Sequence, residues 1–366
     1  MLARITAYIA PTSAAVRPHL VRAMSTYSTP PQARLLAKTR LALVQLGQTS
    51  SDKAFNLAHA REAVLRAAKE DGGADLVVLP ECFNSPYGVS FFDGYAESLE
   101  GLWEKIKKPI SASAQNAAKD ASQEALAERW GVDGKDGAGV DVSGSKSESL
   151  QMLSQVARET GVILVGGSIP ERDDKTGKLY NTSVVFNEKG EAISIHRKVH
   201  LFDIDIPGKM TFKESTTLSA GDRLTVFDCS KGRFGLAICY DLRFPEPAQI
   251  AARIGAAGMI YPGAFNTTTG PRSWELLQRA RATDNQFYVA ACSPARAPQS
   301  ELDAGAYPAY GHSTVVDPWA SVVQTTEEKE GIVRWTLDPD VLTEARKFVP
   351  LGTQRRFDIY PNVVLG

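Results

Sequence analysis

A regular alternation of short apolar runs with helical patterns, from Leu41 onward, most constrains the fold. The runs at 41–46 and 75–81 have the length of buried strands, and the segment between them, 52–70, repeats apolar side chains every three or four residues. The same alternation continues with strand-like runs at 162–166, 182–187, 192–196, 224–227, 234–239, 257–261, 287–291, 313–316 and 332–337, and helical patterns at 245–253 and 271–283. Strands alternating with helices predict an α/β protein.

Size and net charge limit the kinds of molecule that the protein is expected to bind. With 366 residues, 43% of them hydrophobic, the chain can bury one large core or two modest ones. Its formal net charge of −1 lacks the basic excess of proteins that bind nucleic acid or anionic membranes. No apolar stretch approaches the ~20 residues that span a bilayer. We therefore expect a soluble protein that binds a small molecule, without a nucleic-acid or membrane partner.

The cysteines and histidines do not form a metal-binding pattern. Cys82, Cys229, Cys239 and Cys292 include no CxxC pair. A chain of this size does not need disulfides, so we expect reduced thiols. Two histidines, at 196 and 200, are four residues apart, but a strand and turn are predicted there, not the helix of an HExxH zinc motif.

The first 51 residues differ from the rest of the chain. They contain no Asp or Glu but several Arg and Lys among Ser, Thr and Ala. This composition is typical of a mitochondrial transit peptide, and a disordered leader is the alternative. Met24 offers an internal start for a cytoplasmic form. Either way, we expect a leader at 1–38, a catalytic domain at 39–345 and a C-terminal tail at 346–366.

A polar segment at 105–149 interrupts the alternation. It is rich in Lys, Ala, Ser, Gly, Asp and Gln, and the stretch 132–139 has almost nothing to bury. We expect a surface insertion that is partly helical at 111–129 and disordered at 131–147. A catalytic role is not expected.

Three reactive side chains lie where apolar runs end. Glu81 follows a strand, where burial would raise its pKa and suit it to proton transfer, although an exposed loop acid is the commoner case. Lys198 belongs to a basic cluster that ends another strand, where a solvated edge is the alternative. Cys239 lies between a strand and a proline-initiated helix, a position that can present a nucleophile, or is a buried core thiol.

The three segments together resemble the signatures of the nitrilase superfamily. The matching stretches are Leu79-Pro-Glu81, Arg197-Lys198-Val-His200-Leu and Cys239-Tyr-Asp-Leu-Arg243-Phe-Pro-Glu. The similarity extends from about Leu41 to Tyr360. Segments 202–209, 211–215 and 293–296 look most like the omega-amidase branch, which hydrolyses the side-chain amides of 2-oxoglutaramate and 2-oxosuccinamate.

The resemblance implies a fold and a set of roles. The fold would be a four-layer α-β-β-α sandwich. Cys239 would be the nucleophile, Glu81 the general base, Lys198 the cation that stabilises the oxyanion, and Glu214 a supporting acid, unless it is an ordinary loop acid. This chemistry requires no metal or organic cofactor.

The substrate's α-carboxylate calls for a cation. Arg243 is the candidate, and a structural ion pair with Asp241 or Glu246 is the alternative. Tyr87 and Tyr240 are expected to line the pocket, with simple packing as the alternative.

The family commonly forms dimers, so the resemblance also implies a homodimer, with 245–253 and 274–283 as candidate interface helices. Two other functions stay open. One is an amidase for deaminated glutathione or for another carbamoyl or nitrile substrate. The other is a catalytically silent scaffold, which is disfavoured because all three reactive positions hold competent residues.

Overall fold

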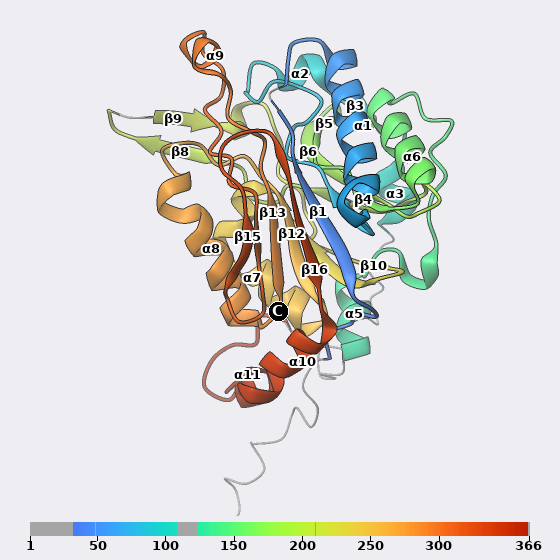
Figure 1. The fold of residues 1–366 in the computed structure, drawn as a ribbon, viewed down its shortest axis with the longest axis vertical. Helices are drawn as coiled ribbons and strands as arrows, with labels where there is room; N and C mark the ends of the chain where they lie inside the picture. Colours follow the sequence, from blue (N-terminus) through green and yellow to red (C-terminus); the bar gives the residue numbers. More distant parts are fainter. Residues whose placement is uncertain (1–31, 48, 108–122, 209, 365–366) are drawn as a thin grey trace, which may run out of the picture.

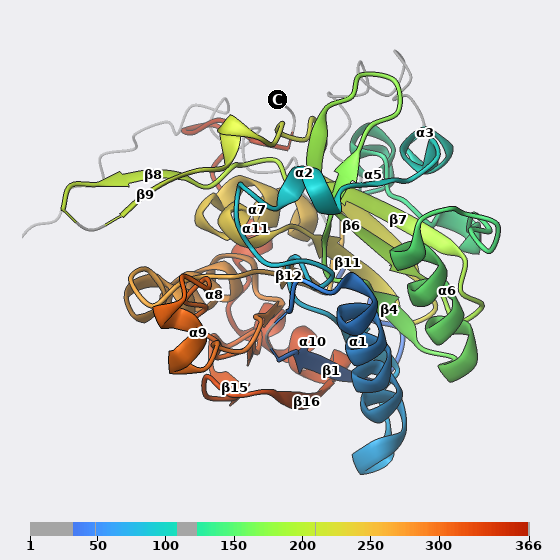
Figure 2. The same ribbon diagram turned by 90° about the horizontal axis from the view of Figure 1, so that it is seen from above.

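The computed structural model describes residues 32–47, 49–107, 123–208 and 210–364. Two β-sheets pack face to face, with helices covering the outer face of each (Figure 1). Figure 2, seen from above, shows α1 and α6 on one side of the sheets and α7 and α8 on the other. This is the four-layer α-β-β-α sandwich, so the expected fold class is confirmed.

The first sheet contains eight strands within the described ranges, in the order β16-β1-β2-β4-β6-β5-β3, with β7 also paired to β6. Strands β1, β2 and β4 run parallel, and β16 runs antiparallel to β1. The strands are β1 (Thr39–Gln45), β2 (Leu76–Val78), β3 (Glu97–Ser98), β4 (Ile163–Val165), β5 (Ile169–Arg172), β6 (Leu179–Phe186), β7 (Ala192–Arg197) and β16 (Gly331–Leu337).

The second sheet has six strands in the described residues, ordered β10 to β15. Its central strands β11, β12 and β13 run parallel. A separate hairpin, β8 (Asp203–Ile206) with β9 (Met210–Lys213), projects from the sandwich (Figure 1). The sheet strands are β10 (Thr225–Cys229), β11 (Gly232–Leu236), β12 (Gly258–Pro262), β13 (Tyr288–Cys292), β14 (Thr314–Val316) and β15 (Val322–Thr325).

Four helices form the two outer layers: α1 (Lys53–Lys69), α6 (Glu148–Thr160), α7 (Pro245–Arg253) and α8 (Gly270–Asn285). The others are α2 (Phe92–Tyr95), α3 (Leu102–Ile106), α5 (Gln123–Trp130), α9 (Gln299–Asp303), α10 (Pro339–Phe348) and α11 (Leu351–Gln354). In the described part of the chain, none of the helices combines the length and apolar character needed to cross a membrane.

The side chains of β1 show why the central strands are continuous apolar runs. Leu41 and Leu43 point into the core between the two sheets, whereas Ala42 and Val44 point toward α1. Successive strand residues face opposite sides, so a sheet covered on both faces needs apolar residues at every position. Burying each such Leu or Val contributes about 1.5–3 kcal/mol.

Some predicted elements differ from the structure at their ends, and others were missed. The strands predicted at 75–81 and 234–239 end at Val78 and Leu236, so Glu81 and Cys239 lie in turns. Strands β5 and β15, the β8–β9 hairpin and helix α10 were not predicted. Of the helix expected at 111–129, residues 111–122 lie outside the described residues, and α5 begins at Gln123.

The prediction of disorder at 131–147 is wrong. Asp133 forms a bridge to Phe227 of β10, and Val140 forms a bridge to Ala192 of β7. These backbone hydrogen bonds extend the edges of existing strands, so the segment is held without a large apolar core of its own.

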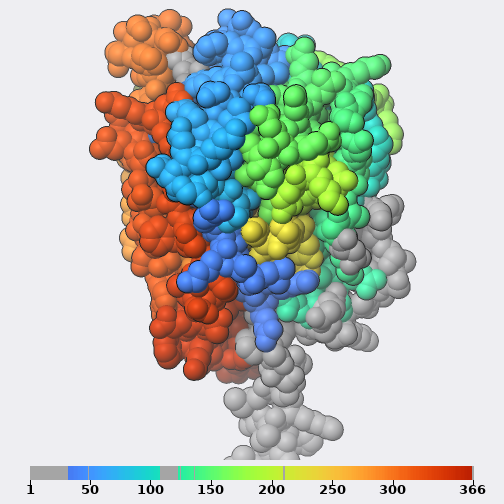
Figure 3. Space-filling model, turned by 45° about the vertical axis from the view of Figure 1, so that its right-hand side comes forward, coloured from blue at the N-terminus to red at the C-terminus, as the bar shows by residue number. Residues whose placement is uncertain are grey.

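The first and last described segments pack against the body of the protein. Residues 1–31 of the expected leader lie outside the described residues, but Leu35 is buried and pairs with Gly232. In Figure 3 the first described residues, in dark blue, lie beside the yellow β10–β11 region and the red C-terminal region. At the other end, α10 runs across the expected domain boundary at 345, and Val364 is buried.

Candidate active site

All four predicted catalytic side chains come from the ends of strands and are buried. Glu81 lies in the turn after β2, and Lys198 directly follows β7. Glu214 opens a 3₁₀ turn after β9 (Glu214–Thr216), and Cys239 opens another after β11 (Cys239–Arg243), called here the nucleophile turn. None of these residues is more than 3% exposed. Both sheets and the hairpin therefore contribute to one site.

The Lys198 ammonium lies between two carboxylates. Its Nζ is 2.9 Å from Glu81 Oε1 and 3.0 Å from Glu214 Oε1. Burial alone would lower the pKa of Lys198, but Glu214 and Glu81 together raise it well above its ordinary value. The lysine therefore stays a cation, so the site has a fixed positive charge in a water-poor environment.

Glu81 has one engaged and one open oxygen. Asn181 Nδ2 donates to the same Oε1 that meets Lys198, at 2.9 Å. Oε2 is buried and has no hydrogen-bond partner among the described residues. Burial raises the pKa of Glu81, and Glu214 adds to the effect, whereas Lys198 opposes it. A raised pKa and an open oxygen suit a group that takes up and returns a proton.

Glu214 is fully engaged by donors. Oε1 accepts a hydrogen bond from the Tyr87 hydroxyl at 2.7 Å as well as from Lys198, and Oε2 accepts the backbone N–H of Phe202 at 2.7 Å. With both oxygens accepting hydrogen bonds, this carboxylate is suited to hold Lys198 in place rather than to move protons. The alternative of an exposed loop acid is wrong, because the side chain is fully buried.

Cys239 has an unusual backbone conformation. Its φ is +47°, a region that non-glycine residues rarely adopt and that is often found at functional sites. Gly263 approaches closely enough that a Cβ there would lie 3.1 Å from Cys239 Cα. Burial, with a contribution from Glu81, raises the pKa of Cys239 well above its ordinary value, and Lys198 opposes this only in part. The resting thiol is therefore protonated and requires a base to react.

Asp241 joins the turn that carries Cys239 to the segment that follows Lys198. It accepts the backbone N–H of Ile238 at 2.9 Å and both the backbone N–H and Nδ1 of His200, at 2.8 and 2.7 Å. Sequence reasoning considered Asp241 only as a partner for an arginine. Its place two residues after the cysteine was the only available signal, because its histidine partners are distant in sequence.

Arg243 points over aromatic rings and not toward an acid. Its guanidinium carbon is 4.9 Å from the Phe265 ring centroid and 5.5 Å from that of Tyr240. Among the described residues, no acid forms an ion pair with it, so the structural ion pair with Asp241 or Glu246 is wrong. A half-buried cation without an acidic partner is suited to bind an anionic group.

Aromatic side chains surround Tyr87. Its ring centroid lies 4.4 Å from that of Tyr307 and 5.9 Å from that of Phe212, which is stacked on it. The Tyr307 hydroxyl donates to the Ala264 carbonyl at 2.7 Å. Burial, followed by the nearby Cys239, raises the pKa of Tyr307 well above its ordinary value. Tyr307 and Phe212 were missed. Nothing in the sequence links Tyr307 to this site, and for Phe212 the only signal was its place two residues before Glu214. Tyr240 is not part of this aromatic group around Tyr87. Its ring centroid lies 5.2 Å from that of Phe202.

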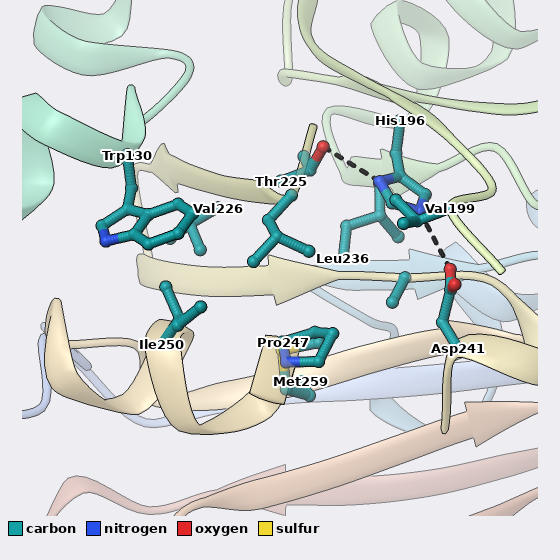
Figure 4. A pocket seen from close by; sticks show the side chains of 12 residues that line it. Trp130, His196, Val199, Thr225, Val226, Leu236, Asp241, Pro247, Ile250 and Met259 are labelled. Carbon is teal, nitrogen blue, oxygen red and sulfur yellow. Dashed lines mark hydrogen bonds and ion pairs between the residues drawn. The ribbon is translucent and has the colours of Figure 1, made fainter. Parts of the chain in front are cut away.

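The two histidines of the basic cluster, His196 and His200, both form hydrogen bonds with Asp241. His196 Nε2 lies 3.2 Å from Asp241 Oδ2, and His196 Nδ1 lies 3.0 Å from Thr225 Oγ1 (Figure 4). The hydrogen bonds from His196 and His200 hold the pKa of Asp241 well below its ordinary value, although burial alone would raise it. Across the described ranges, no three His, Cys, Asp or Glu side chains gather as a metal site.

Comparison with known proteins identifies close relatives. The sequence profile of carbon–nitrogen hydrolases matches residues 40–347. The chain is 48% identical over 325 residues to hydrolase C26A3.11 of Schizosaccharomyces pombe, covering 89% of this chain and 84% of that protein. It is 47% identical over 329 residues to omega-amidase NIT3 of Saccharomyces cerevisiae, covering 90% and 97% of the two chains. The crystal structure of S. cerevisiae Nit3, described as a member of branch 10 of the nitrilase superfamily, superposes with a TM-score of 0.69 at 45% identity, covering 88% and 98%.

Proposed function

The chain belongs to the carbon–nitrogen hydrolase family, and on that premise we propose that it is an omega-amidase working through a cysteine thioester. It hydrolyses carbon–nitrogen bonds in linear amides. The substrates are the side-chain amides of 2-oxoglutaramate and 2-oxosuccinamate, and the products are the dicarboxylic keto acid and ammonia. One observation supports the mechanism above all: a buried thiol lies beside a buried ammonium held between two carboxylates.

Acylation begins with proton transfer. The open Oε2 of Glu81 takes the proton of the Cys239 thiol as the sulfur attacks the amide carbon. Negative charge then develops on the amide oxygen, and the Lys198 ammonium stabilises it. Glu81 returns the proton to the amide nitrogen, the carbon–nitrogen bond breaks, and ammonia leaves a thioester on the sulfur.

Deacylation uses the same groups. A water molecule attacks the thioester carbon while Glu81 takes its proton, and Lys198 again stabilises the oxyanion. The carbon–sulfur bond breaks, the proton returns from Glu81 to the sulfur, and the carboxylic acid is released. Glu214 contributes by keeping Lys198 in position.

Selectivity for keto-acid amides is assigned to Arg243. Its guanidinium has no acidic partner in the described chain, so it is available to the substrate's α-carboxylate. Tyr240 lies under this guanidinium, and Tyr87 stands beside Glu214, so both would line the same pocket.

The proposal is tested by ammonia release from 2-oxoglutaramate, deaminated glutathione, a nitrile and a neutral amide, each measured with the wild type. Turnover dominated by 2-oxoglutaramate supports the assignment. Preference for deaminated glutathione would keep the amidase chemistry and reject the omega-amidase assignment. No turnover of any of the four would favour the scaffold.

We also propose that a mitochondrial leader precedes the catalytic domain, with Met24 providing a cytoplasmic form. Support comes from the absence of acids before residue 52. Because Leu35 packs against the second sheet, cleavage is expected before Leu35 rather than at 38. Microscopy of fluorescent fusions starting at Met1 or Met24 tests the proposal, which requires only the longer form to enter mitochondria.

The assembly proposed is a homodimer through α7 and α8. These helices form the outer layer of the second sheet, and Leu276 on α8 is 66% exposed. Light scattering coupled to gel filtration measures the mass directly. A dimer that dissociates in Leu276→Asp supports the interface, and a monomeric wild type contradicts it.

A further inference from the structure

The polar insertion contains a buried ion pair that the proposed mechanism does not use. Lys107 Nζ lies 2.6 Å from Asp133 Oδ2, and the two side chains are 2% and 4% exposed. Lys107 follows α3, and Asp133 follows α5. Removing two charges from water costs several kcal/mol per ion, so buried pairs are seldom favourable for stability alone. This pair therefore calls for a further explanation.

A continuous line of buried hydrogen bonds runs from Lys107 toward the active site. Lys107 Nζ donates to Thr225 Oγ1 at 3.0 Å, and Thr225 Oγ1 is 3.0 Å from His196 Nδ1. His196 Nε2 is in turn 3.2 Å from Asp241 Oδ2, and Figure 4 shows these last two links side by side. Next to them, between Trp130 and Asp241, is a cavity of ≈ 10 Å³, room for about one water molecule.

The chemistry of each group fixes the direction of the hydrogen bonds. Asp241 is a carboxylate and only accepts, so His196 Nε2 carries a hydrogen and donates. Thr225 Oγ1 accepts from the Lys107 ammonium, so the hydroxyl keeps its own hydrogen to donate to His196 Nδ1. That hydroxyl also lies 3.3 Å from the Ile195 carbonyl, a longer contact. Since an ammonium only donates, Lys107 directs the Thr225 hydrogen toward His196.

Asp241, at the far end of this line, holds the nucleophile turn. The oxygen that receives His196 Nε2, Oδ2, also accepts the backbone N–H of Ile238, the residue before Cys239. We propose that Lys107, paired with Asp133, positions the nucleophile by orienting Thr225, His196 and Asp241, so that the insertion supports catalysis from behind the site. The inference rests on the proposed function for its activity readout.

The ion pair is not needed to attach the insertion. The backbone N–H of Asp133 donates to Val226 at 2.9 Å, and its carbonyl accepts from Asp228 at 2.9 Å. Ser194 Oγ also donates to Asp133 Oδ2 at 2.6 Å. These bonds remain when Lys107 is changed, so the effect of such a change on catalysis can be separated from loss of the segment.

The test uses five variants of the full chain. Lys107→Met and Thr225→Val interrupt the line, and the double variant combines them. Thr225→Ser keeps the hydroxyl, and Lys105→Met is the matched control, an exposed lysine two residues from Lys107. Each is measured for kcat and KM with 2-oxoglutaramate, for thermal unfolding, and for the rate at which iodoacetamide alkylates Cys239, followed by peptide mass.

Loss of one orienting hydrogen bond is expected to lower both kcat and the alkylation rate about tenfold in Lys107→Met and in Thr225→Val, with KM changed less than about threefold. The double variant should be no worse than either single variant, because both act through one path. Thr225→Ser should recover most of the loss, and Lys105→Met should match the wild type.

The proposal is overturned if Lys107→Met and Thr225→Val stay within about twofold of Lys105→Met in both rates. Thr225→Ser being as defective as Thr225→Val would also overturn it, since the hydroxyl would then be irrelevant. If Lys107→Met does not fold, the nearly isosteric Thr225→Val and Thr225→Ser decide. If the wild type releases no ammonia, the proposed function fails, but the alkylation rates still test the positioning.

Discussion

Asp241 provides the sharpest test of how the fold positions its nucleophile. Its carboxylate accepts four hydrogen bonds, from the backbone N–H groups of Ile238 and His200 and from the rings of His196 and His200. Asp241→Ala would remove the carboxylate whose hydrogen bonds join the nucleophile turn to the segment that carries Lys198.

The expected loss of stability in Asp241→Ala follows from the hydrogen-bond donors that would be left without an acceptor. The donors on His196 and Ile238 are buried, and each buried donor without an acceptor costs about 1–3 kcal/mol, together about 2–6 kcal/mol. The donors of His200 are partly buried and can reach water. With an unfolding entropy of about 2.1 cal/mol/K per residue over 366 residues, Tm should fall by roughly 3–8 °C. A displacement of about 1 Å at Cys239 should lower kcat about 100-fold.

Calorimetry and steady-state ammonia release measure the two effects on the same preparation. Asp317→Ala is the matched control, because Asp317 Oδ1 also accepts two backbone N–H groups in a turn, at 2.9 Å, away from the site. We expect Asp317→Ala to lower Tm slightly and to leave kcat unchanged. If folded Asp241→Ala retained kcat within about twofold of the wild type, the positioning argument would be refuted.

Three further results are expected. Arg243→Ala should raise KM for 2-oxoglutaramate about 10- to 100-fold, the loss of one charge-assisted hydrogen bond, and leave KM for a neutral amide nearly unchanged; equal losses for both would contradict the assignment. Burial raises the pKa of Glu81 above its ordinary 4.5, so folding retains a proton there and stability falls as pH rises from 4.5 toward the raised value. Glu81→Gln removes that loss, so its Tm relative to wild type should rise over this interval, and a constant difference would contradict the sign. Compared with deletion of residues 1–31, deletion through 38 also removes buried Leu35 and should cost about 1.5–3 kcal/mol, measured by urea unfolding.

The fold class was predictable because a strand buried on both faces shows itself as a run of consecutive apolar residues. In β1 every residue from Leu41 to Val44 is apolar, as a covered central strand requires. The layering came from the family resemblance, since sheet order is set by distant pairings. Leu41, for example, lies between Leu76 and Trp335, and no local pattern joins these residues.

The site was predictable only in its reactive residues. Glu81, Lys198 and Cys239 stand out by chemistry at the ends of apolar runs, but their convergence in one buried site depends on contacts from elsewhere in the chain. Asp241 acquires its role only because the chain brings His200 beside it. The prediction of disorder in the insertion failed for a similar reason. Asp133 is held by backbone hydrogen bonds to β10, and composition does not reveal them.

The most direct test of the account is ammonia release from 2-oxoglutaramate by wild type and Cys239→Ala, with thermal unfolding of both. Turnover by the wild type, no turnover by the variant and nearly equal Tm values are predicted. Ammonia release by a folded Cys239→Ala protein at a rate near that of the wild type would contradict the thioester mechanism.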